Sequence, residues 1–274
     1  MILDGKKIAV EILAKVKSEV AKLSFQPVFC DVLVGGDPAS AQYVKMKGRM
    51  AEKLGIKFKN AHFPESISTE NLVAEIKKIN QEPNICGLIV QLPLPSAIDK
   101  QAVLDAIESK IDVDCTGKVN MDLFYTGHAY VINPTAGSVM ELLDSAKVDL
   151  KDKKFLVIGH GQLVGKPVEF LLKARGFAVD VARSKTENIL ELMKNADVII
   201  SAVGKPKLIS GDKIKAGSII IDAGTAESEG GIAGDVDFES VKNIAGFISP
   251  VPGGVGPVTV AHLLNNVLKV AQSK

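Results

Sequence analysis

The stretch from Phe155 to Pro167, FLVIGHGQLVGKP, places an apolar strand before a glycine-containing turn and a helical segment. A dinucleotide-binding βα unit begins in this way, because glycines at the turn let backbone N–H groups approach a pyrophosphate. The spacing differs from the G-x-G-x-x-G fingerprint, since Gly159 and Gly161 are followed by Val164, and the next glycine is Gly165. The pattern predicts a dinucleotide site; the alternative is a tight turn whose glycines serve backbone geometry alone.

Strand-like and helix-like segments alternate along the chain. We expect strands near 27–36, 56–63, 85–92, 155–158, 177–181, 198–203, 218–224 and 244–252. We expect helices near 5–23, 38–54, 69–79, 100–108, 138–145, 163–174, 186–194 and 255–272. Asp37 suits the N-cap of the second helix, with Pro38 at its first position and Gly55 after its last turn. This alternation predicts the α/β class with mostly parallel sheets.

The segment from Asp112 to Pro134 contains glycine and asparagine and shows no clean periodicity. A chain of 274 residues is long enough for two domains. We therefore expect this segment to be the junction between two α/β domains.

Charge and composition exclude several classes of partner. A formal net charge of +1 gives no strong field for nucleic acid or a membrane surface. The first 23 residues mix charged and apolar side chains at helical spacing, unlike a signal peptide or a membrane span. We expect a cytoplasmic protein whose partners are small molecules.

Cysteines and histidines are scattered along the chain. Cys30, Cys86 and Cys115 lie mostly in apolar runs without C-x-x-C pairing, which favours reduced packing residues. The four histidines are far apart in sequence, so no metal-ligand spacing is present and no metal site is expected.

The residues at the end of the expected strand 177–181 bear on the choice between NAD and NADP. An acidic residue there suits the ribose 2′-hydroxyl of NAD, and a basic residue suits the 2′-phosphate of NADP. Asp180 lies inside the apolar run, whereas Arg183, Ser184 and Lys185 follow it. Arginine with a neighbouring hydroxyl binds a phosphate well, so NADP is favoured; the alternative is a solvated basic loop.

Three residues of the first half form a candidate proton-handling group. Tyr43 and Lys47 are four apart on a predicted helix and share one face. Gln91 closes a strand whose carboxyl end is a ligand-binding position in open α/β sheets. The alternative is a solvated lysine beside a half-buried tyrosine. Short-chain dehydrogenases have the same Y-x-x-x-K spacing after their dinucleotide turn. Here Tyr43 and Lys47 lie far before the glycine turn, which argues against a short-chain dehydrogenase.

Two further stretches are candidate ligand contacts. DVDC, residues 112–115, supplies carboxylates directly after the first α/β unit. SPVPGGVGPVT, residues 249–259, combines prolines with glycines and suits close backbone contact with a flat ligand, with a structural hinge as the alternative.

A series of stretches along nearly the whole chain resembles the methylenetetrahydrofolate dehydrogenase/cyclohydrolase family. In order they are VGGDPASAQYVKMK, GLIVQLPLP, DVD, the glycine turn, ADVIISAVGKP, IIIDAG, GDVDF and PVPGGVGPVT. The combination of QLPLP and PVPGGVGPVT is highly specific.

The resemblance implies two α/β domains facing each other across a cleft. Residues 1–118, completed by a C-terminal helix at 255–274, would form the tetrahydrofolate-binding catalytic domain, and residues 119–254 a Rossmann-type NADP domain. It also implies a homodimer. The implied activity oxidises 5,10-methylenetetrahydrofolate with NADP+ and hydrolyses the methenyl product to 10-formyltetrahydrofolate.

The resemblance also implies roles for single residues. Lys47 matches the catalytic lysine of the hydrolysis, Tyr43 a tyrosine stacked near the folate, Gln91 the glutamine bonded to the lysine, and Asp114 the carboxylate that reads the pterin. The folate contacts would be Pro252, Gly253, Gly254 and Val255. The cofactor contacts would be Gly159, His160, Gly161, Arg183, Ser184 and Thr225.

The chain departs from the family at several positions. His160 and Gly161 replace a common arginine and serine at the turn, and Arg183 replaces a frequent histidine. Cys86 and Cys115 stand where aspartate and glycine are usual, and NPTA replaces P-C-T-P at residues 133–136. Two alternatives therefore remain: a monofunctional NAD-dependent dehydrogenase of the same fold, and a catalytically silent folate- or nucleotide-binding protein.

Overall fold

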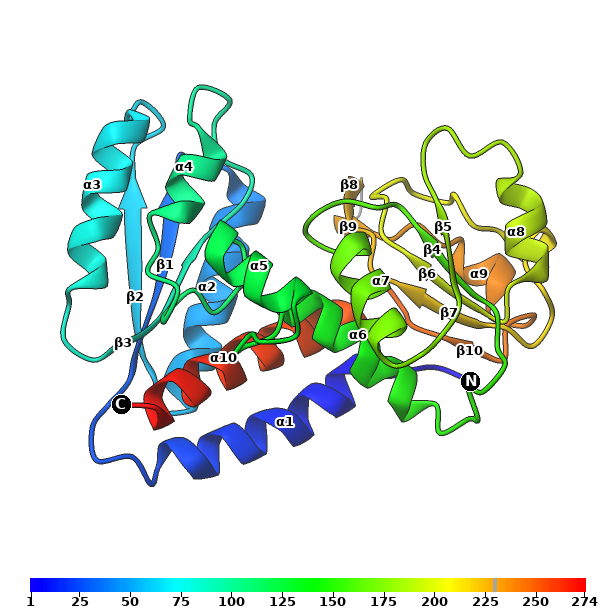
Figure 1. Cartoon of the computed structure of the whole chain (residues 1–274), viewed down its shortest axis with the longest axis horizontal. Coiled ribbons are helices and arrows are strands. Elements are labelled where there is room, and N and C mark those ends of the chain that lie inside the picture. Colours follow the sequence, from blue (N-terminus) through cyan, green and yellow to red (C-terminus); the bar gives the residue numbers. More distant parts are fainter. Residues whose placement is uncertain (229–230) are drawn as a thin grey trace. The chain divides into compact units, whose positions relative to one another are not determined.

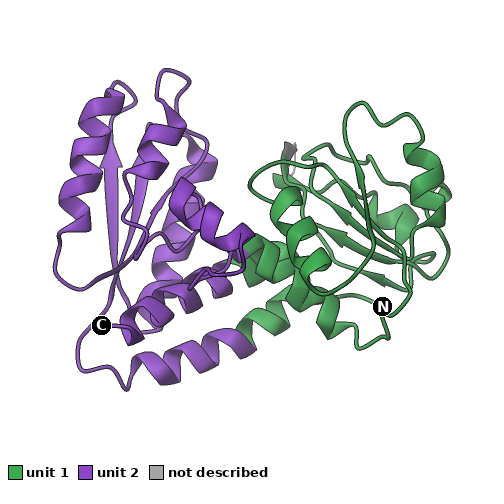
Figure 2. Cartoon of the chain, viewed as in Figure 1, with its two compact units in different colours: residues 1–10, 135–259 green, residues 11–134, 260–274 purple. Residues whose placement is uncertain are grey.

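A computed structural model describes residues 1–228 and 231–274 (Figure 1). Its internal contacts divide the chain into two compact units, coloured separately in Figure 2. Unit 1 comprises Met1–Val10 and Thr135–Thr259, and unit 2 comprises Glu11–Pro134 and Val260–Lys274. The predicted domains instead divide at residue 118 and assign residues 1–10 and 255–259 to the folate-binding part. Helices α1 (Gly5–Val20) and α10 (Val255–Gln272) each contain residues of both units.

Unit 2 contains a three-stranded parallel sheet in the order β2–β1–β3. The strands are β1 (Val28–Val34), β2 (Lys57–Phe63) and β3 (Ile85–Val90). Every residue of β3 is buried, as are all residues of β1 after Val28. Continuous apolar runs of this kind are typical of parallel strands covered on both faces.

Three helices of unit 2 begin where the sequence predicts. Asp37 caps α2 (Pro38–Lys53) by accepting a 2.7 Å hydrogen bond from the N–H of Ser40, and Gly55 has a φ of +87° after its last turn. The helices α3 (Thr69–Asn80) and α4 (Lys100–Asp105) follow β2 and β3, respectively. α2 packs against both β1 and β2, which fixes its buried face over the sheet.

The helix α5 (Lys118–Tyr125), which is not among the predicted helices, lies inside the segment expected to join the two domains. Its start is held by Asp112, whose carboxylate accepts hydrogen bonds from the N–H groups of Thr116 and Gly117. Only Asn120 and Phe124 of this helix are buried, so its apolar periodicity is weak. The next helix, α6 (Pro134–Ser145), begins four residues before its predicted start.

Unit 1 contains a five-stranded parallel sheet in the order β10–β7–β6–β4–β5. Its strands are β4 (Phe155–Ile158), β5 (Val179–Ala182), β6 (Val198–Ser201), β7 (Ile219–Asp222) and β10 (Phe247–Ile248). The helices α7 (Gly165–Ala174) and α8 (Ile189–Asn195) connect β4 to β5 and β5 to β6. This βαβαβ order confirms the predicted Rossmann-type unit.

Several short elements of unit 1 have no counterpart in the prediction. They are an antiparallel pair, β8 (Ala226–Ser228) with β9 (Gly231–Ala233), a 3₁₀ turn (Gly211–Lys213) and α9 (Phe238–Val241). Each is four residues or shorter, too short for hydrophobic periodicity to reveal. None of the helices in the described ranges is both long and apolar enough to cross a membrane.

Candidate active site

The predicted lysine lies inside unit 2, with 3% of its surface exposed. α2 directs the Lys47 side chain toward the sheet, where Nζ donates a 2.9 Å hydrogen bond to Oε1 of Gln91. Nζ also lies 2.7 Å from Oδ2 of Asp31, and 4.9 Å from the centre of the Tyr43 ring. The prediction that Tyr43 and Lys47 share one helix face is confirmed.

Gln91 is held in one orientation directly after β3. Its backbone N–H donates to the carbonyl oxygen of Val32 at 2.8 Å, and its side-chain Nε2 donates to the carbonyl oxygen of Leu92 at 2.6 Å. Since Nε2 is committed to a carbonyl, Oε1 is the atom that faces Lys47. The strand and the turn after it therefore present a fixed acceptor to the lysine.

Asp31 is the residue of this cluster that the sequence analysis missed. It lies in the middle of the central strand β1, with 0% of its surface exposed. Burial raises its pKa to about 6, although the Lys47 charge acts in the opposite direction. The available signal was a single charged residue inside the apolar run VFCDVLV.

Asp114 belongs to the same electrostatic environment. It is half-buried, and burial raises its pKa while Lys47 opposes that change. Burial also raises the pKa of the Tyr43 phenol, with further contributions from Asp114 and Asp31. One ammonium, two carboxylates and a phenol thus interact in a poorly solvated region, which is a common arrangement at sites of proton transfer.

Asp112, the other carboxylate of DVDC, forms hydrogen bonds with residues that follow it closely in the chain. Besides its bonds to the start of α5, its carbonyl oxygen accepts a 2.9 Å hydrogen bond from Nδ2 of Asn120. Burial raises its pKa to about 6, despite the backbone hydrogen bonds to its carboxylate. Nearby Cys115 is buried, as are Cys30 and Cys86, and all three are free thiols.

The glycine turn of unit 1 has the geometry of a nucleotide-binding turn. Gly159 has a φ of +88°, and its N–H donates to the carbonyl oxygen of Ala182 at 2.9 Å. A Cβ on Gly165, the first residue of α7, would overlap the Gly159 carbonyl. Gly165 therefore permits the close helix–strand packing that the fingerprint assigns to its third glycine. A Cβ on Gly161 would meet no atom within 4 Å, so the turn is open there.

His160, between these glycines, is engaged by α7. Its Nε2 makes a short contact with Oε2 of Glu169, whose other oxygen accepts a 2.7 Å hydrogen bond from Lys173. Burial acts to raise the pKa of Glu169, but the hydrogen bonds from Lys173 and His160 hold it below its ordinary value. The imidazole of the turn is thus oriented by a carboxylate of α7.

The residues predicted to read the ribose lie at the carboxyl end of β5. Arg183, Ser184 and Lys185 are exposed, and the Arg183 N–H donates to Oγ1 of Thr186 at 2.9 Å. Within residues 1–228 and 231–274, the Arg183 guanidinium makes no hydrogen bond or ion pair. Thr225 is exposed just after β7.

The loops at the carboxyl ends of β6 and β7 are held by two buried carboxylates. Asp235 accepts hydrogen bonds from Ser201 Oγ at 2.6 Å and from the N–H groups of Val203 and Lys205 at 2.8 and 2.6 Å. Asp222 accepts from the N–H groups of Gly224, Asp235 and Val236. Burial raises the pKa of Asp222 to about 6 in spite of these bonds.

The predicted folate contacts Pro252–Val255 lie directly before and at the start of α10. Gly253 has a φ of +115°, and a Cβ on Gly5 would overlap the Gly254 carbonyl. Gly253, Gly254 and Val255 are buried, while Pro252 is exposed. The close approach of Gly5 to the Gly254 backbone lies within unit 1, and the predicted contact of this stretch with a flat ligand stays a prediction.

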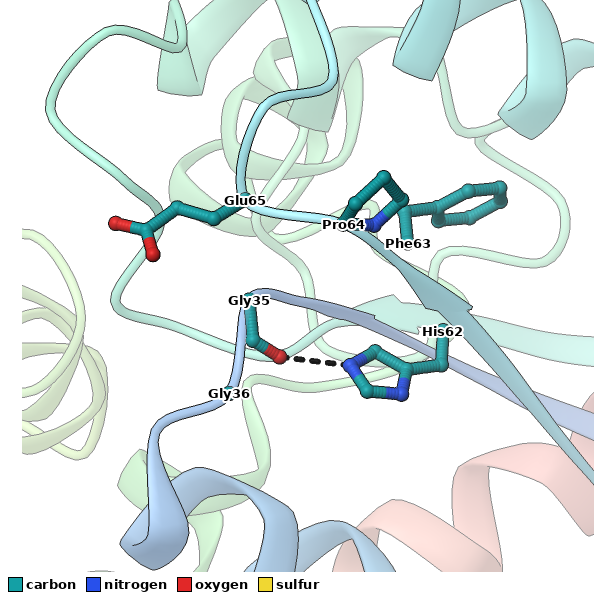
Figure 3. Close-up of a pocket in the computed structure, with 6 residues that line it drawn as sticks. All are labelled: Gly35, Gly36, His62, Phe63, Pro64 and Glu65. Carbon is teal, nitrogen blue, oxygen red and sulfur yellow. Dashed lines mark hydrogen bonds between the residues drawn. The ribbon is translucent and has the colours of Figure 1, made fainter.

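A separate hollow of about 340 Å³ lies at the carboxyl end of β1 (Figure 3). It is lined by Gly35, Gly36, His62, Phe63, Pro64 and Glu65. The imidazole Nε2 of His62 lies 2.7 Å from the carbonyl oxygen of Gly35. None of the predicted site residues lines this hollow, and it is not the candidate site.

Comparison with known proteins connects both units to one family. Residues 3–114 match the tetrahydrofolate dehydrogenase/cyclohydrolase catalytic domain, and residues 133–274 match its NAD(P)-binding domain. The chain is 44% identical to the bifunctional protein FolD of Moorella thermoacetica over 275 residues, covering 99% of this chain and 98% of the relative.

Solved structures give the same relationship. The bifunctional FolD enzyme of Campylobacter jejuni is similar with a TM-score of 0.95 and 37% identity, covering 100% of this chain and 99% of that one. The Trypanosoma brucei enzyme, solved with NADP and an inhibitor, has a TM-score of 0.94 and 33% identity, with 100% and 97% coverage. The chain belongs to the tetrahydrofolate dehydrogenase/cyclohydrolase family.

Proposed function

We propose that this chain oxidises 5,10-methylenetetrahydrofolate with NADP+ and hydrolyses the resulting methenyl cation to 10-formyltetrahydrofolate. The observation that carries the proposal is the buried Lys47, bonded to Gln91 and Asp31 inside the domain that matches the catalytic family. A lysine removed from water and surrounded by fixed acceptors suits proton transfer to and from the water used in the hydrolysis.

The other residues of unit 2 would bind and orient the folate. The Tyr43 ring offers a flat apolar surface beside the lysine, and Asp114 offers carboxylate oxygens to the donor groups of a pterin. Burial raises the Tyr43 pKa, so the phenol stays neutral at physiological pH. From unit 1, we assign Pro252, Gly253, Gly254 and Val255 to backbone contact with the same substrate.

The cofactor residues would hold NADP+ in unit 1, where bound NADP+ supplies the hydride acceptor. The open turn at Gly161 and the positive end of α7 suit a pyrophosphate. Gly159 follows β4 and Thr225 follows β7, two strands of the same parallel sheet that are separated by β6. The uncommitted Arg183 guanidinium and the Ser184 hydroxyl suit the 2′-phosphate. His160, already oriented by Glu169, would contribute imidazole near the pyrophosphate.

Two assays separate this proposal from its alternatives. Purified protein mixed with methylenetetrahydrofolate and NADP+ should produce methenyl absorbance, and no change would contradict the dehydrogenase assignment and favour a silent binding protein. Parallel reactions with NAD+ should be slower; a preference for NAD+ would favour the monofunctional alternative.

The hydrolysis has its own test. Added methenyltetrahydrofolate should lose its absorbance faster with the protein than without it, and Lys47→Met should abolish this difference. We also propose a cytoplasmic homodimer, which light scattering of the purified protein and fractionation of its native cells would test.

A further inference from the structure

The sequence of β1 places a carboxylate where an apolar side chain is expected. Asp31 lies in the central strand of the sheet, paired in register with Asn60 of β2 and Ile89 of β3. Its side chain is fully buried. A buried carboxylate without compensation costs several kcal/mol by order of magnitude, so such a residue persists only with a specific partner.

Lys47 is that partner. The 2.7 Å contact between its Nζ and Oδ2 of Asp31 joins two side chains with exposed fractions of 3% and 0%. Within the described ranges, no other group donates a hydrogen bond to either Asp31 oxygen. The carboxylate is therefore committed to one ammonium group and has spare acceptor capacity.

The groups around Asp31 are few and can be named. Lys47 and Tyr43 face it from α2, and Asp114 acts on it from the segment after β3. Burial raises the pKa of Asp31 to about 6, with Lys47 acting against this change and Asp114 adding to it. A carboxylate with this pKa accepts protons far more readily near neutral pH than an exposed aspartate does.

We propose that Asp31 is a positioning residue for the hydrolysis, which holds Lys47 against Gln91 and accepts a proton from its Nζ. This inference rests on the proposed catalytic role of Lys47. In the step, the Nζ–H bond breaks as the Oδ2–H bond forms, leaving an amine lone pair on Nζ. That lone pair takes a proton from water as the water oxygen bonds to the methenyl carbon. No oxidant or further reactant is needed.

Gln91 and Asp31 then have different tasks. Gln91 can only orient Nζ, because its amide oxygen does not take up a proton near neutral pH. Asp31 can both orient Nζ and receive its proton without exchange with solvent, since the pair is buried. Loss of Asp31 should therefore alter the pH dependence of hydrolysis, whereas a purely structural role would alter stability alone.

The test is the pH–rate profile of methenyl hydrolysis for the full-length wild type and Asp31→Asn. We expect the wild-type kcat to fall as the pH is lowered through about 6, because protonated Asp31 no longer accepts the Lys47 proton. Asp31→Asn should lose about 10- to 100-fold in kcat at neutral pH and lack this acid limb, with KM changed less than kcat. If Asp31→Asn does not fold, Asp31→Thr supplies a strand-forming, non-titrating side chain of similar size.

Asp112→Asn is the matched control. It removes a buried carboxylate of the same unit whose pKa is also about 6, but which bonds to backbone N–H groups instead of Lys47. This variant should unfold at lower temperature yet keep the wild-type acid limb. An Asp31→Asn enzyme with wild-type kcat and acid limb, or an equal change in Asp112→Asn, would overturn the inference.

Different results would contradict the proposed function and the proposed role of Asp31. A wild type that does not hydrolyse the methenyl substrate, or a Lys47→Met variant that does so fully, contradicts the proposed function itself. An active wild type and an inactive Lys47→Met, combined with an unaltered Asp31→Asn profile, contradict only the role of Asp31.

Discussion

The Nζ of Lys47 donates a 2.9 Å hydrogen bond to Oε1 of Gln91, joining residues that are 44 positions apart in the chain. The bond connects α2 to the turn after β3, and it depends on the Gln91 amide being fixed by the Leu92 carbonyl. A lysine held by a helix alone would retain rotamer freedom, whereas this one is aimed by a second element.

Gln91→Leu should therefore impair hydrolysis more than folding. The substitution leaves a buried N–H of Lys47 without its acceptor, which costs about 1–3 kcal/mol in the free energy of unfolding. We expect kcat for methenyl hydrolysis to fall about 10- to 100-fold, measured as the loss of methenyl absorbance. Gln101→Leu removes an amide whose Nε2 donates a hydrogen bond to Asp105 on α4, and it should leave kcat within about twofold. Equal effects of the two variants would contradict the role of Gln91.

Arg183→Ala tests the cofactor assignment. The side chain is exposed after β5 and makes no ion pair in the part of the chain that the structure describes, so its removal should cost little stability. Loss of a charged contact to the 2′-phosphate should raise KM for NADP+ by about tenfold or more. NAD+ lacks this phosphate and serves as the internal control, because its KM should hardly change. A parallel rise for both cofactors would argue against 2′-phosphate recognition.

Gly48→Ala tests the packing that places Lys47. Gly48 lies on the buried face of α2, and a Cβ there would overlap the ring of Phe58 on β2. Alanine favours a helix by about 1 kcal/mol over glycine, but overpacking costs about 1–3 kcal/mol. We expect a net loss of stability in chemical denaturation.

A second helical glycine supplies the control for this variant. A Cβ on Gly256 in α10 would meet no atom within 4 Å. Gly256→Ala should therefore leave the denaturation midpoint unchanged or raise it. A stabilised Gly48→Ala protein would mean that α2 can move away from β2 at little cost.

The raised pKa of Asp222 leads us to expect that the free energy of unfolding depends on pH in an unusual direction. Its folded-state pKa of about 6 lies above the ordinary value of 3.8, so the folded protein binds more protons than the unfolded chain between these values. Stability should consequently rise as the pH falls from 7 toward 4, by an amount on the order of 3 kcal/mol for this group. Denaturation midpoints measured across this range should show a smaller rise for Asp222→Asn.

Asp197 offers a control of opposite sign. The Lys154 N–H and the Lys215 side chain hold its pKa below the ordinary value, so its contribution is lost as the pH falls. Asp197→Asn should leave the rise toward acid intact or make it steeper. If Asp222→Asn retains the full wild-type dependence, another buried carboxyl, such as Asp31 or Asp112, accounts for it.

Local sequence patterns were sufficient to predict most of the helices and strands. The two cap signals of α2, the apolar runs of β3 and β4, and the strand–helix alternation of unit 1 all depend on neighbours in sequence. The helix α5 was missed because its start is fixed by Asp112, through polar contacts that leave no apolar stripe. The division into units also differs from the predicted domains, since it depends on long-range contacts.

The sequence by itself determined the α/β class, the family resemblance and the candidate residues Tyr43, Lys47, Gln91 and Asp114. Only the tertiary structure decided that Asp31 pairs with Lys47, and that Gly165 packs against the Gly159 carbonyl in place of a regularly spaced third glycine. The physical reason is the same in both cases. Burial, ion pairing and backbone overlap depend on distances between atoms of different elements. Local sequence patterns determine the helices and strands, whereas tertiary packing determines the distances between them.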